Sequence, residues 1–144
     1  MCDAQRFVDR FTEDWQKLNP AEFGKWWHPD GKLTWPGMEK TINGSKQEPQ
    51  FIANLKAVTP DFRQDVVGWA ARETSDETWV FIEWKARGSM MERLIEWSGA
   101  TRFRLIQDQA IEGVAYWDTQ PLWAAIDPSM KRPGLLSVVG VEPK

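Results

Sequence analysis

The spacing of apolar residues changes near Phe62, and that change restricts the folds open to this chain. Before Phe62, apolar side chains recur every three to four residues, as on one face of an amphipathic helix. After it, apolar and polar residues alternate, which is the pattern of a strand with one buried face. The expected helices cover 4–18, 21–27, 46–58 and 120–126, and the expected strands cover 32–36, 62–73, 77–87, 93–107 and 110–118.

This order of elements predicts an α+β fold. We expect a cone-shaped, curved antiparallel sheet that wraps around the N-terminal helices and encloses a pocket at its wide end. One domain is expected over 1–127, because a chain of this length is most simply a single domain with one core. Residues 128–144 are expected to form a C-terminal tail, laid on the body or on a partner.

Capping and turn residues give the expected ends of several elements. Asp3 is the predicted N-cap of the first helix. Ser45 is the predicted N-cap of the helix over 46–58, with Glu48 completing a capping box. The sequence His28-Pro29-Asp30-Gly31 predicts a turn, Gly88-Ser89 predicts the start of a strand connection, and Gln107-Asp108-Gln109 predicts another.

The strand over 77–87 has two different faces. We expect the face formed by Thr78, Val80, Ile82, Trp84 and Ala86 to lie inside. The opposite face is aromatic at one end and charged at the other, and is formed by Trp79, Phe81, Glu83, Lys85 and Arg87. A face of this composition favours cover by a partner subunit over exposure to water, so a homodimer through the sheet is expected.

Tryptophan is unusually frequent, with ten among 144 residues. One interpretation is that several line a concave space that binds a flat apolar molecule, and the other is a bulky core with a dimer face. Trp15, Trp35, Trp84 and Trp97 are the expected cavity walls, with solid core as the alternative. The predicted substrate-binding set consists of these four residues with Phe11, Phe51 and Thr101.

Composition excludes several classes of partner. The net charge is −3, and a chain without a broad basic surface is not expected to bind nucleic acid. No apolar run approaches the length of a membrane span, and no signal peptide is visible, so no membrane partner is expected. Cys2 is the single cysteine, which excludes an internal disulfide framework and fits a reducing cytoplasm.

Several short motifs resemble the nuclear transport factor 2-like superfamily. They are Trp26-Trp27-His28-Pro29-Asp30, Trp35-Pro36-Gly37, Ile42-Asn43-Gly44, Thr59-Pro60-Asp61-Phe62 and Gly113-Val114-Ala115-Tyr116-Trp117-Asp118. The resemblance covers roughly residues 4–126 and is strongest for the SnoaL-like polyketide cyclase and ketosteroid isomerase branch. It implies the cone-shaped fold. It does not imply one activity, because this scaffold hosts isomerases, cyclases, dehydratases, hydrolases and proteins without enzymatic activity.

The catalytic acids that the resemblance implies are not matched in this chain. The general base of ketosteroid isomerases falls at Trp35, and their oxyanion-hole acid falls near Thr101. The Asp and His of SnoaL-like cyclases align near Tyr116 and Arg102, and a gap of one residue moves the first to Ala115. The Asp-Arg-Asp set of limonene epoxide hydrolase has its last Asp at the same position, and its Arg-x-Asp maps loosely to Phe81 and Glu83.

Three other residues are the predicted catalytic candidates. Tyr116 could donate to a developing enolate if it faces the cavity, and is otherwise a core tyrosine. Asp118 shares its face and could act as an acid or base, with capping of the helix over 120–126 as the alternative. His28 is the single histidine and a possible base, with a structural hydrogen bond in its turn as the alternative.

The remaining candidates do not indicate a metal site or a cofactor site. Glu83 and Glu96 are mid-strand carboxylates that cross-strand ion pairs or a dimer interface explain more simply. A lone histidine makes a protein-built metal site unexpected, so no metal ligand is predicted. No phosphate loop or dinucleotide fingerprint is present, so no cofactor is predicted.

Two functional hypotheses follow. The first is a cofactor-free SnoaL-like enzyme that uses acid/base chemistry for cyclisation, isomerisation or dehydration, acting as an isomerase, cyclase or lyase. Its substrate would be a flat, apolar, oxygenated metabolite such as a polyketide or terpenoid. The second is a non-catalytic module of the same fold that binds a small molecule or another protein, which the unmatched family acids favour.

Overall fold

The computed structural model describes residues 3–35, 40–127, 129 and 138–141. The helices are α1 (Ala4–Lys17), α2 (Pro20–Gly24), α3 (Gly44–Val58) and α4 (Gln120–Ile126) in this part of the chain. Its strands are β1 (Trp27–Thr34), β2 (Ile42–Asn43), β3 (Arg63–Glu73), β4 (Thr78–Met90), β5 (Arg93–Ile106) and β6 (Gln109–Trp117). The expected end of the first strand at Pro36, and most of the expected tail over 128–144, lie outside the described residues.

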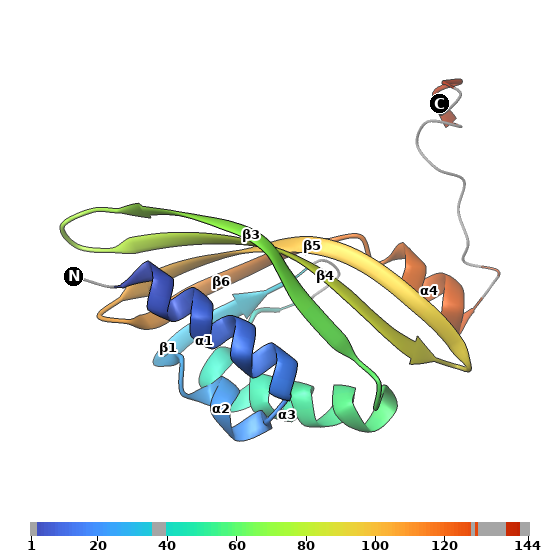
Figure 1. Cartoon of the computed structure of the whole chain (residues 1–144), viewed down its shortest axis with the longest axis horizontal. Helices are drawn as coiled ribbons and strands as arrows, with labels where there is room; N and C mark the ends of the chain where they lie inside the picture. Colours follow the sequence, from blue (N-terminus) through green and yellow to red (C-terminus); the bar gives the residue numbers. More distant parts are fainter. Residues whose placement is uncertain (1–2, 36–39, 128, 130–137, 142–144) are drawn as a thin grey trace.

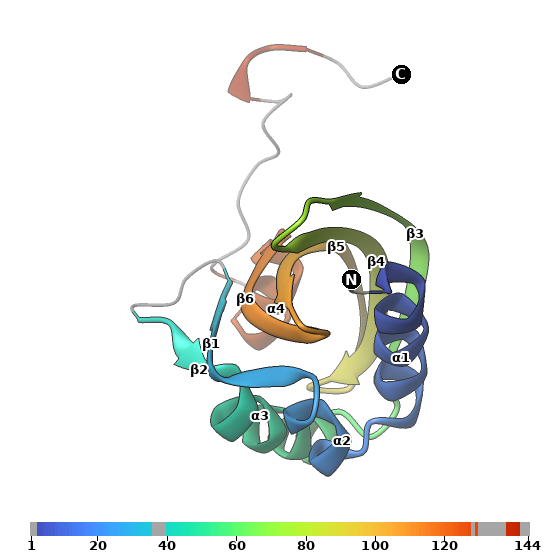
Figure 2. The same cartoon turned by 90° about the vertical axis from the view of Figure 1, so that its left-hand side faces the viewer.

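Within the described residues the strands form one sheet in the order β2-β1-β6-β5-β4-β3. Neighbouring strands are antiparallel except β1 and β6, which are parallel. The sheet curves strongly, and α1, α2 and α3 cover its open side (Figures 1 and 2). The predicted α+β fold, with a curved sheet wrapped over N-terminal helices, is therefore confirmed.

The burial pattern of β4 confirms the predicted inner face. Thr78, Val80, Ile82, Trp84 and Ala86 are all buried, while the alternating residues are exposed or half-buried. The inner face packs against α1, whose own buried residues are spaced by three and four positions and are Ala4, Phe7, Val8, Phe11 and Asp14. As predicted, Asp3 is the N-cap of this helix, and its side chain accepts from the backbone N–H of Arg6.

The second helix and the first strand differ from their predicted bounds. The helix ends at Gly24, and the strand begins at Trp27, so the predicted turn over 28–31 lies inside β1. The pairing of β1 with β6 shifts register between Trp27 and Lys32, which accommodates Pro29 within the strand. This extended start holds the Trp27 ring against the first residue of α3, where a Cβ on Gly44 would lie 2.1 Å from the ring.

The predicted capping box at Ser45 is wrong. The N-cap of α3 is Asn43, whose side chain accepts from the backbone N–H of Lys46. The helix therefore begins two residues earlier than predicted. Glu48 is then too far from the helix start to complete a cap, and its side chain is buried instead.

The connection between β4 and β5 also lies later than predicted. β4 continues to Met90, and Met91 and Glu92 form the turn, both with positive φ. Gly88 is instead a packing position inside the strand, because a Cβ there would lie 2.4 Å from Thr59 Cγ2. The connection predicted at Gln107-Asp108 is confirmed by a turn with positive φ at both residues.

Candidate functional site

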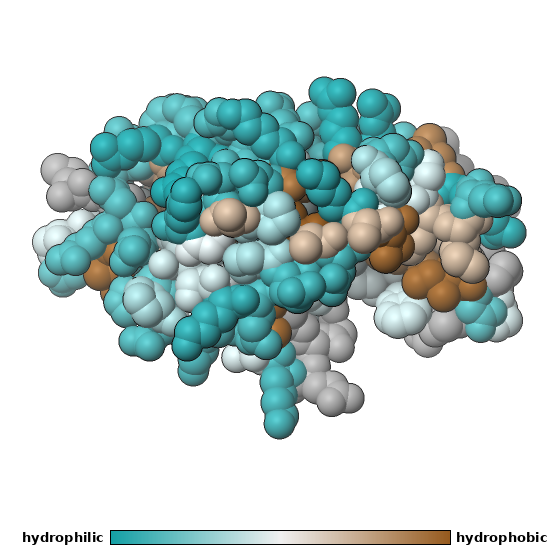
Figure 3. Space-filling view, turned by 90° about the horizontal axis from the view of Figure 1, so that it is seen from below, coloured by the Kyte–Doolittle hydropathy of each residue, from teal (hydrophilic) through white to brown (hydrophobic). Residues whose placement is uncertain are grey.

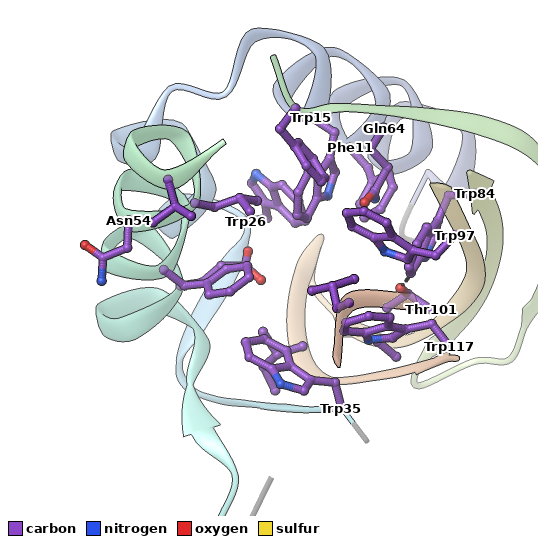
Figure 4. A pocket seen from close by; sticks show the side chains of 18 of the residues that line it. Phe11, Trp15, Trp26, Trp35, Asn54, Gln64, Trp84, Trp97, Thr101 and Trp117 are labelled. Carbon is purple, nitrogen blue, oxygen red and sulfur yellow. Dashed lines mark hydrogen bonds between the residues drawn. The ribbon is translucent and has the colours of Figure 1, made fainter. Parts of the chain in front are cut away.

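A cavity of about 380 Å³ lies between the concave face of the sheet and the helices α1 and α3. The side chains that face it come from three helices and five strands that are far apart in the sequence (Figure 4). The described residues that line it are Phe11, Trp15, Trp26, Leu33, Trp35, Glu48, Phe51, Asn54, Leu55, Val58, Phe62, Gln64, Trp84, Met90, Trp97, Thr101, Phe103, Ala115, Trp117 and Leu122.

All seven residues of the predicted substrate-binding set line this one cavity. They are Phe11, Trp15, Trp35, Phe51, Trp84, Trp97 and Thr101. Helical spacing places Phe11 and Trp15 on one face of α1, and strand alternation places Trp97 and Thr101 on one face of β5. The structure thus brings the set together, and its role in binding remains a prediction.

Aromatic contacts run along the cavity wall. Trp97 lies between Phe62 and Trp117, with ring centroids 5.8 and 6.0 Å apart. Trp35 packs on Phe51 at 4.9 Å. These rings are tilted against one another, and an aromatic wall of this kind suits a planar apolar ligand.

The ten tryptophans divide among the cavity wall, the core and the surface. Six of them line the cavity, namely Trp15, Trp26, Trp35, Trp84, Trp97 and Trp117. Trp27 is a fully packed core residue, and Trp79 lies on the outer face of the sheet beneath the Arg102 guanidinium, 5.0 Å from it. Cavity walls and core therefore account for most of the tryptophans, whereas Trp69 and Trp123 are 39% and 50% exposed.

The cavity opens at one end of the molecule. Val58, at the end of α3, lines the cavity and is 63% exposed. Met90 at the end of β4 and Leu122 at the start of α4 line the same cavity. Both of these element ends lie on the right in Figure 1. Seen from below, apolar residues gather toward this side, while most of the remaining surface is hydrophilic (Figure 3).

Glu48 is the acid/base side chain among the described residues that line the cavity. It is 5% exposed, and its Oε1 accepts a hydrogen bond of 3.2 Å from the Trp27 indole N–H. Burial raises the pKa of Glu48 to about 8, and the hydrogen bond from Trp27 opposes that rise only partly. Near neutral pH the group is therefore mainly a neutral carboxylic acid, which can donate a proton to a bound molecule.

Glu48 was not predicted as a site residue, because the sequence pattern placed it in a helix cap. A signal was nevertheless present. Glu48 lies three and seven residues before Phe51 and Leu55 on the helix, which places it on the apolar face. A carboxyl group on the buried face of a helix is unusual, and such groups concentrate at functional sites.

Other polar groups in the cavity are neutral. Thr101 Oγ1 accepts a hydrogen bond of 2.9 Å from the Trp84 indole N–H (Figure 4). Gln64 is 5% exposed, and its amide forms no hydrogen bond with the described residues. The indole N–H of Trp15 is buried and likewise has no acceptor in the part of the chain that the structure describes.

Tyr116 does not face the cavity, which corrects the prediction. Its neighbours Ala115 and Trp117 line the cavity, so strand alternation directs Tyr116 to the opposite face of the sheet. The side chain is accordingly 58% exposed. Ala115, the other position that the family resemblance selected, reaches the cavity but carries no acid group.

The other two predicted catalytic residues are also outside the cavity lining. Asp118 is exposed, and its carboxylate accepts from the backbone N–H of Gln120, the first residue of α4, although the N-cap of that helix is Thr119 and not Asp118. Nδ1 of His28 accepts from the backbone N–H of Asp30, in keeping with a structural hydrogen bond. The structure therefore does not bring Tyr116, Asp118 and His28 together.

Glu83 and Glu96 are exposed residues of the outer sheet face, and neither forms an ion pair with another described residue. The described residues contain no group of three or more His, Cys, Asp and Glu side chains that could hold a metal ion. In the same residues, no helix is long and apolar enough to cross a membrane.

Solved structures show the same fold at low sequence identity. A hypothetical protein with a ketosteroid isomerase-like fold from Catenulispora acidiphila, in complex with trimethylamine, matches with a TM-score of 0.68 and 19% identity, over 83% of this chain and 90% of that one. An LEH-like epoxide hydrolase from M. tuberculosis matches with a TM-score of 0.66 and 15% identity, over 91% and 95%. A protein from Jannaschia sp. CCS1, proposed to be a SnoaL-like polyketide cyclase, gives 0.66 and 15%, over 90% and 94%.

Sequence comparison identifies the family. No curated protein sequence matches the chain. The family model of the SnoaL-like domain matches residues 8–113, which is well over half of the chain. That stretch runs from α1 to β6 and includes Glu48 and most of the cavity wall. The chain therefore belongs to the SnoaL-like domain family.

Proposed function

We propose that this chain is a SnoaL-like enzyme that performs acid/base chemistry on a flat, apolar, oxygenated metabolite such as a polyketide or terpenoid. Glu48 is the proton donor. Its neutral carboxyl group gives a proton to a ligand oxygen as negative charge develops there. The resulting carboxylate keeps the hydrogen bond from Trp27 and takes a proton back from the ligand, which completes a cyclisation, isomerisation or dehydration.

One observation carries this proposal: a buried carboxyl group lies in the wall of an otherwise apolar, tryptophan-lined cavity. An acid in such surroundings is held neutral at a pH where an exposed glutamate is ionised. Exclusion of water also strengthens each polar contact with a ligand. Membership of the SnoaL-like family supports the same class of chemistry, since that scaffold places proton-transfer groups in a pocket of this kind.

The first experiment measures ligand binding through the tryptophans of the cavity. Purified protein is titrated with planar polyketides, steroids and terpenoids, and tryptophan fluorescence is recorded. Saturable quenching at micromolar ligand supports an aromatic binding cavity and ranks the compound classes for turnover assays. Lack of quenching by every class contradicts the proposed substrate type.

Replacement of Glu48 tests the chemistry. Glu48→Gln keeps the size and neutrality of the side chain but removes the transferable proton, so turnover is expected to fall by about 10²–10⁴-fold. Binding of the same ligand is expected to change little. In the wild type, the rate is expected to fall as the pH rises through about 8, where Glu48 loses its proton.

Tyr116→Phe is the matched control, because Tyr116 lies on the opposite face of the sheet. Its turnover is expected to equal that of the wild type. Turnover that survives in Glu48→Gln but falls in Tyr116→Phe would remove Glu48 from the mechanism and restore the catalytic role first predicted for Tyr116.

A second candidate function is binding without catalysis. Three of the positions at which the family resemblance places acids, Trp35, Thr101 and Ala115, line the cavity without an acid group. For a module of this kind, ligands bind but are recovered unchanged, and Glu48→Gln alters neither affinity nor product formation. Product analysis after prolonged incubation with each bound ligand separates the two candidates.

A further inference from the structure

Gln64 is a buried polar residue that the proposed chemistry does not use. It lies on β3 and is 5% exposed, and it lines the cavity. Its side-chain amide can form several hydrogen bonds, but it makes none with the described residues. The amide atoms are not among the fully enclosed polar atoms without a partner, so they are accessible from the cavity and can form hydrogen bonds with a molecule held there.

The sheet register places Gln64 beside an aromatic wall. Gln64 is opposite Ala86 on β4, and Ala86 is opposite Trp97 on β5. The small side chain of Ala86 thus lies between Gln64 and Trp97, whose longer side chains both project into the cavity. Figure 4 shows the Gln64 amide extending towards the cavity next to the Trp97 ring. A planar ligand packed against Trp97 would present its edge to the Gln64 amide.

The chemistry of this position restricts the ligand. The amide N–H₂ donates and the amide C=O accepts, so the complementary group has an acceptor oxygen next to a donor. No Lys, Arg or His is found among the described residues that line the cavity, so no positively charged side chain there would balance the negative charge of a ligand carboxylate. The complementary group is therefore neutral.

We infer that Gln64 and Trp97 form a specificity subsite for a planar ring that carries a neutral carbonyl group with an adjacent hydrogen-bond donor. The inference rests on the proposed function in one respect, because the subsite and Glu48 lie in the same cavity. The subsite selects which molecules bind, whereas Glu48 acts on them. Gln64 is a binding residue and takes no part in proton transfer.

Three probes with one ring system test the subsite. They are 2-naphthamide (carbonyl with donor), methyl 2-naphthoate (carbonyl alone) and naphthalene (neither). Binding is measured by isothermal titration calorimetry with protein injected into the probe. Wild-type protein is expected to bind 2-naphthamide about tenfold more tightly than naphthalene, with the ester between them.

Gln64→Leu removes the amide and keeps a side chain of similar size. It is expected to weaken 2-naphthamide binding about tenfold and to leave naphthalene binding unchanged or slightly stronger. Tyr116→Phe is the control on the outer face and is expected to bind all three probes like the wild type. Gln64→Asn, which keeps the amide on a shorter stem, is expected to retain part of the preference for 2-naphthamide.

Other outcomes overturn the inference. Equal weakening of all three probes by Gln64→Leu would mean that Gln64 only supports packing. An unchanged preference for 2-naphthamide in Gln64→Leu, or no measurable binding of any probe to the wild type, would also contradict the subsite. Failure of the proposed function is a separate result, because Glu48→Gln can leave turnover unchanged while the preference conferred by Gln64 persists.

Discussion

Each of the buried carboxyl groups of Asp14 and Glu48 accepts a hydrogen bond from a tryptophan. Trp26 donates to Asp14 and Trp27 donates to Glu48, so adjacent residues of the chain serve two acids on different helices. Burial raises the pKa of Asp14 as well, but a hydrogen bond from Trp26 and the nearby Arg10 oppose it. Glu48 has no such cation beside it. Desolvation by complete burial, opposed only by the hydrogen bond from Trp27, explains why Glu48 stays protonated near neutral pH.

This protonation makes stability depend on pH. The pKa of Glu48 is about 8 in the folded protein against an ordinary value of 4.5, so the folded state binds this proton more tightly. The free energy of unfolding is therefore expected to fall as the pH rises from about 4.5 to about 8, by roughly 5 kcal/mol at most. Glu48→Gln has no proton to lose and is expected to show a flatter profile over that range.

Urea denaturation at several pH values between 5 and 9 measures the effect. The informative quantity is the difference between wild type and Glu48→Gln, because contributions from Asp14 and the other acids are common to both. The difference is expected to grow with pH and to favour the variant. Parallel profiles would show that Glu48 is ionised in the folded state.

At the scale of elements, the β4–β5 hairpin closes through a turn made by Met91 and Glu92, with φ values of 54° and 63°. Two positive φ angles in a two-residue turn match the type I′ geometry that favours glycine and asparagine. Glu92→Gly is therefore expected to stabilise the protein by about 0.5–1 kcal/mol. Leu94→Gly, at an exposed strand position next to the turn, is the control and is expected to destabilise it by a similar amount.

Thermal unfolding of Glu92→Gly and Leu94→Gly measures these two changes in stability. The expected result is a higher Tm for Glu92→Gly and a lower Tm for Leu94→Gly. Because Met90 lines the cavity beside this turn, the same variants report whether the hairpin affects ligand binding. A lower Tm for both variants would mean that chain flexibility outweighs the relief of backbone strain.

At the scale of the whole molecule, the outer face of the sheet is the surface that the fold leaves without internal cover. Phe81 and Tyr116 lie on it, 47% and 58% exposed. Trp79 lies on the same face beneath Arg102. We expect a homodimer through this face, because aromatic residues on an open sheet face are typical of interfaces.

Phe81→Lys places a charge in that face and is expected to shift the protein to the monomer. Ile126→Lys is the control, since Ile126 is equally exposed but lies on α4. Light scattering over a range of concentrations gives the mass of each. A monomer mass for the wild type at high concentration would contradict the expected dimer.

The sequence by itself determined which residues could form the cavity wall. Alternation and helical spacing depend on neighbours in the chain, so the inner face of β4 and the cavity-facing positions Phe11, Trp15 and Trp97 follow from local pattern. The bounds of short or irregular segments did not follow from the local pattern. The start of β1 at Trp27 depends on pairing with β6 and on packing against Gly44, which are contacts with distant parts of the chain.

Only the tertiary structure decided which polar groups reach the cavity. Tyr116 and Ala115 are adjacent in sequence, and only the observed register shows which of them points inwards. Glu48 on α3 and Gln64 on β3 belong to different elements, and their side chains reach the same cavity only in the folded protein. The aromatic wall could be predicted from the sequence because such residues bury large apolar surface wherever they fall. The position of Glu48 on an apolar helix face could also be read from the sequence, but its neutral state could not, because that state arises from desolvation by side chains that are distant in sequence.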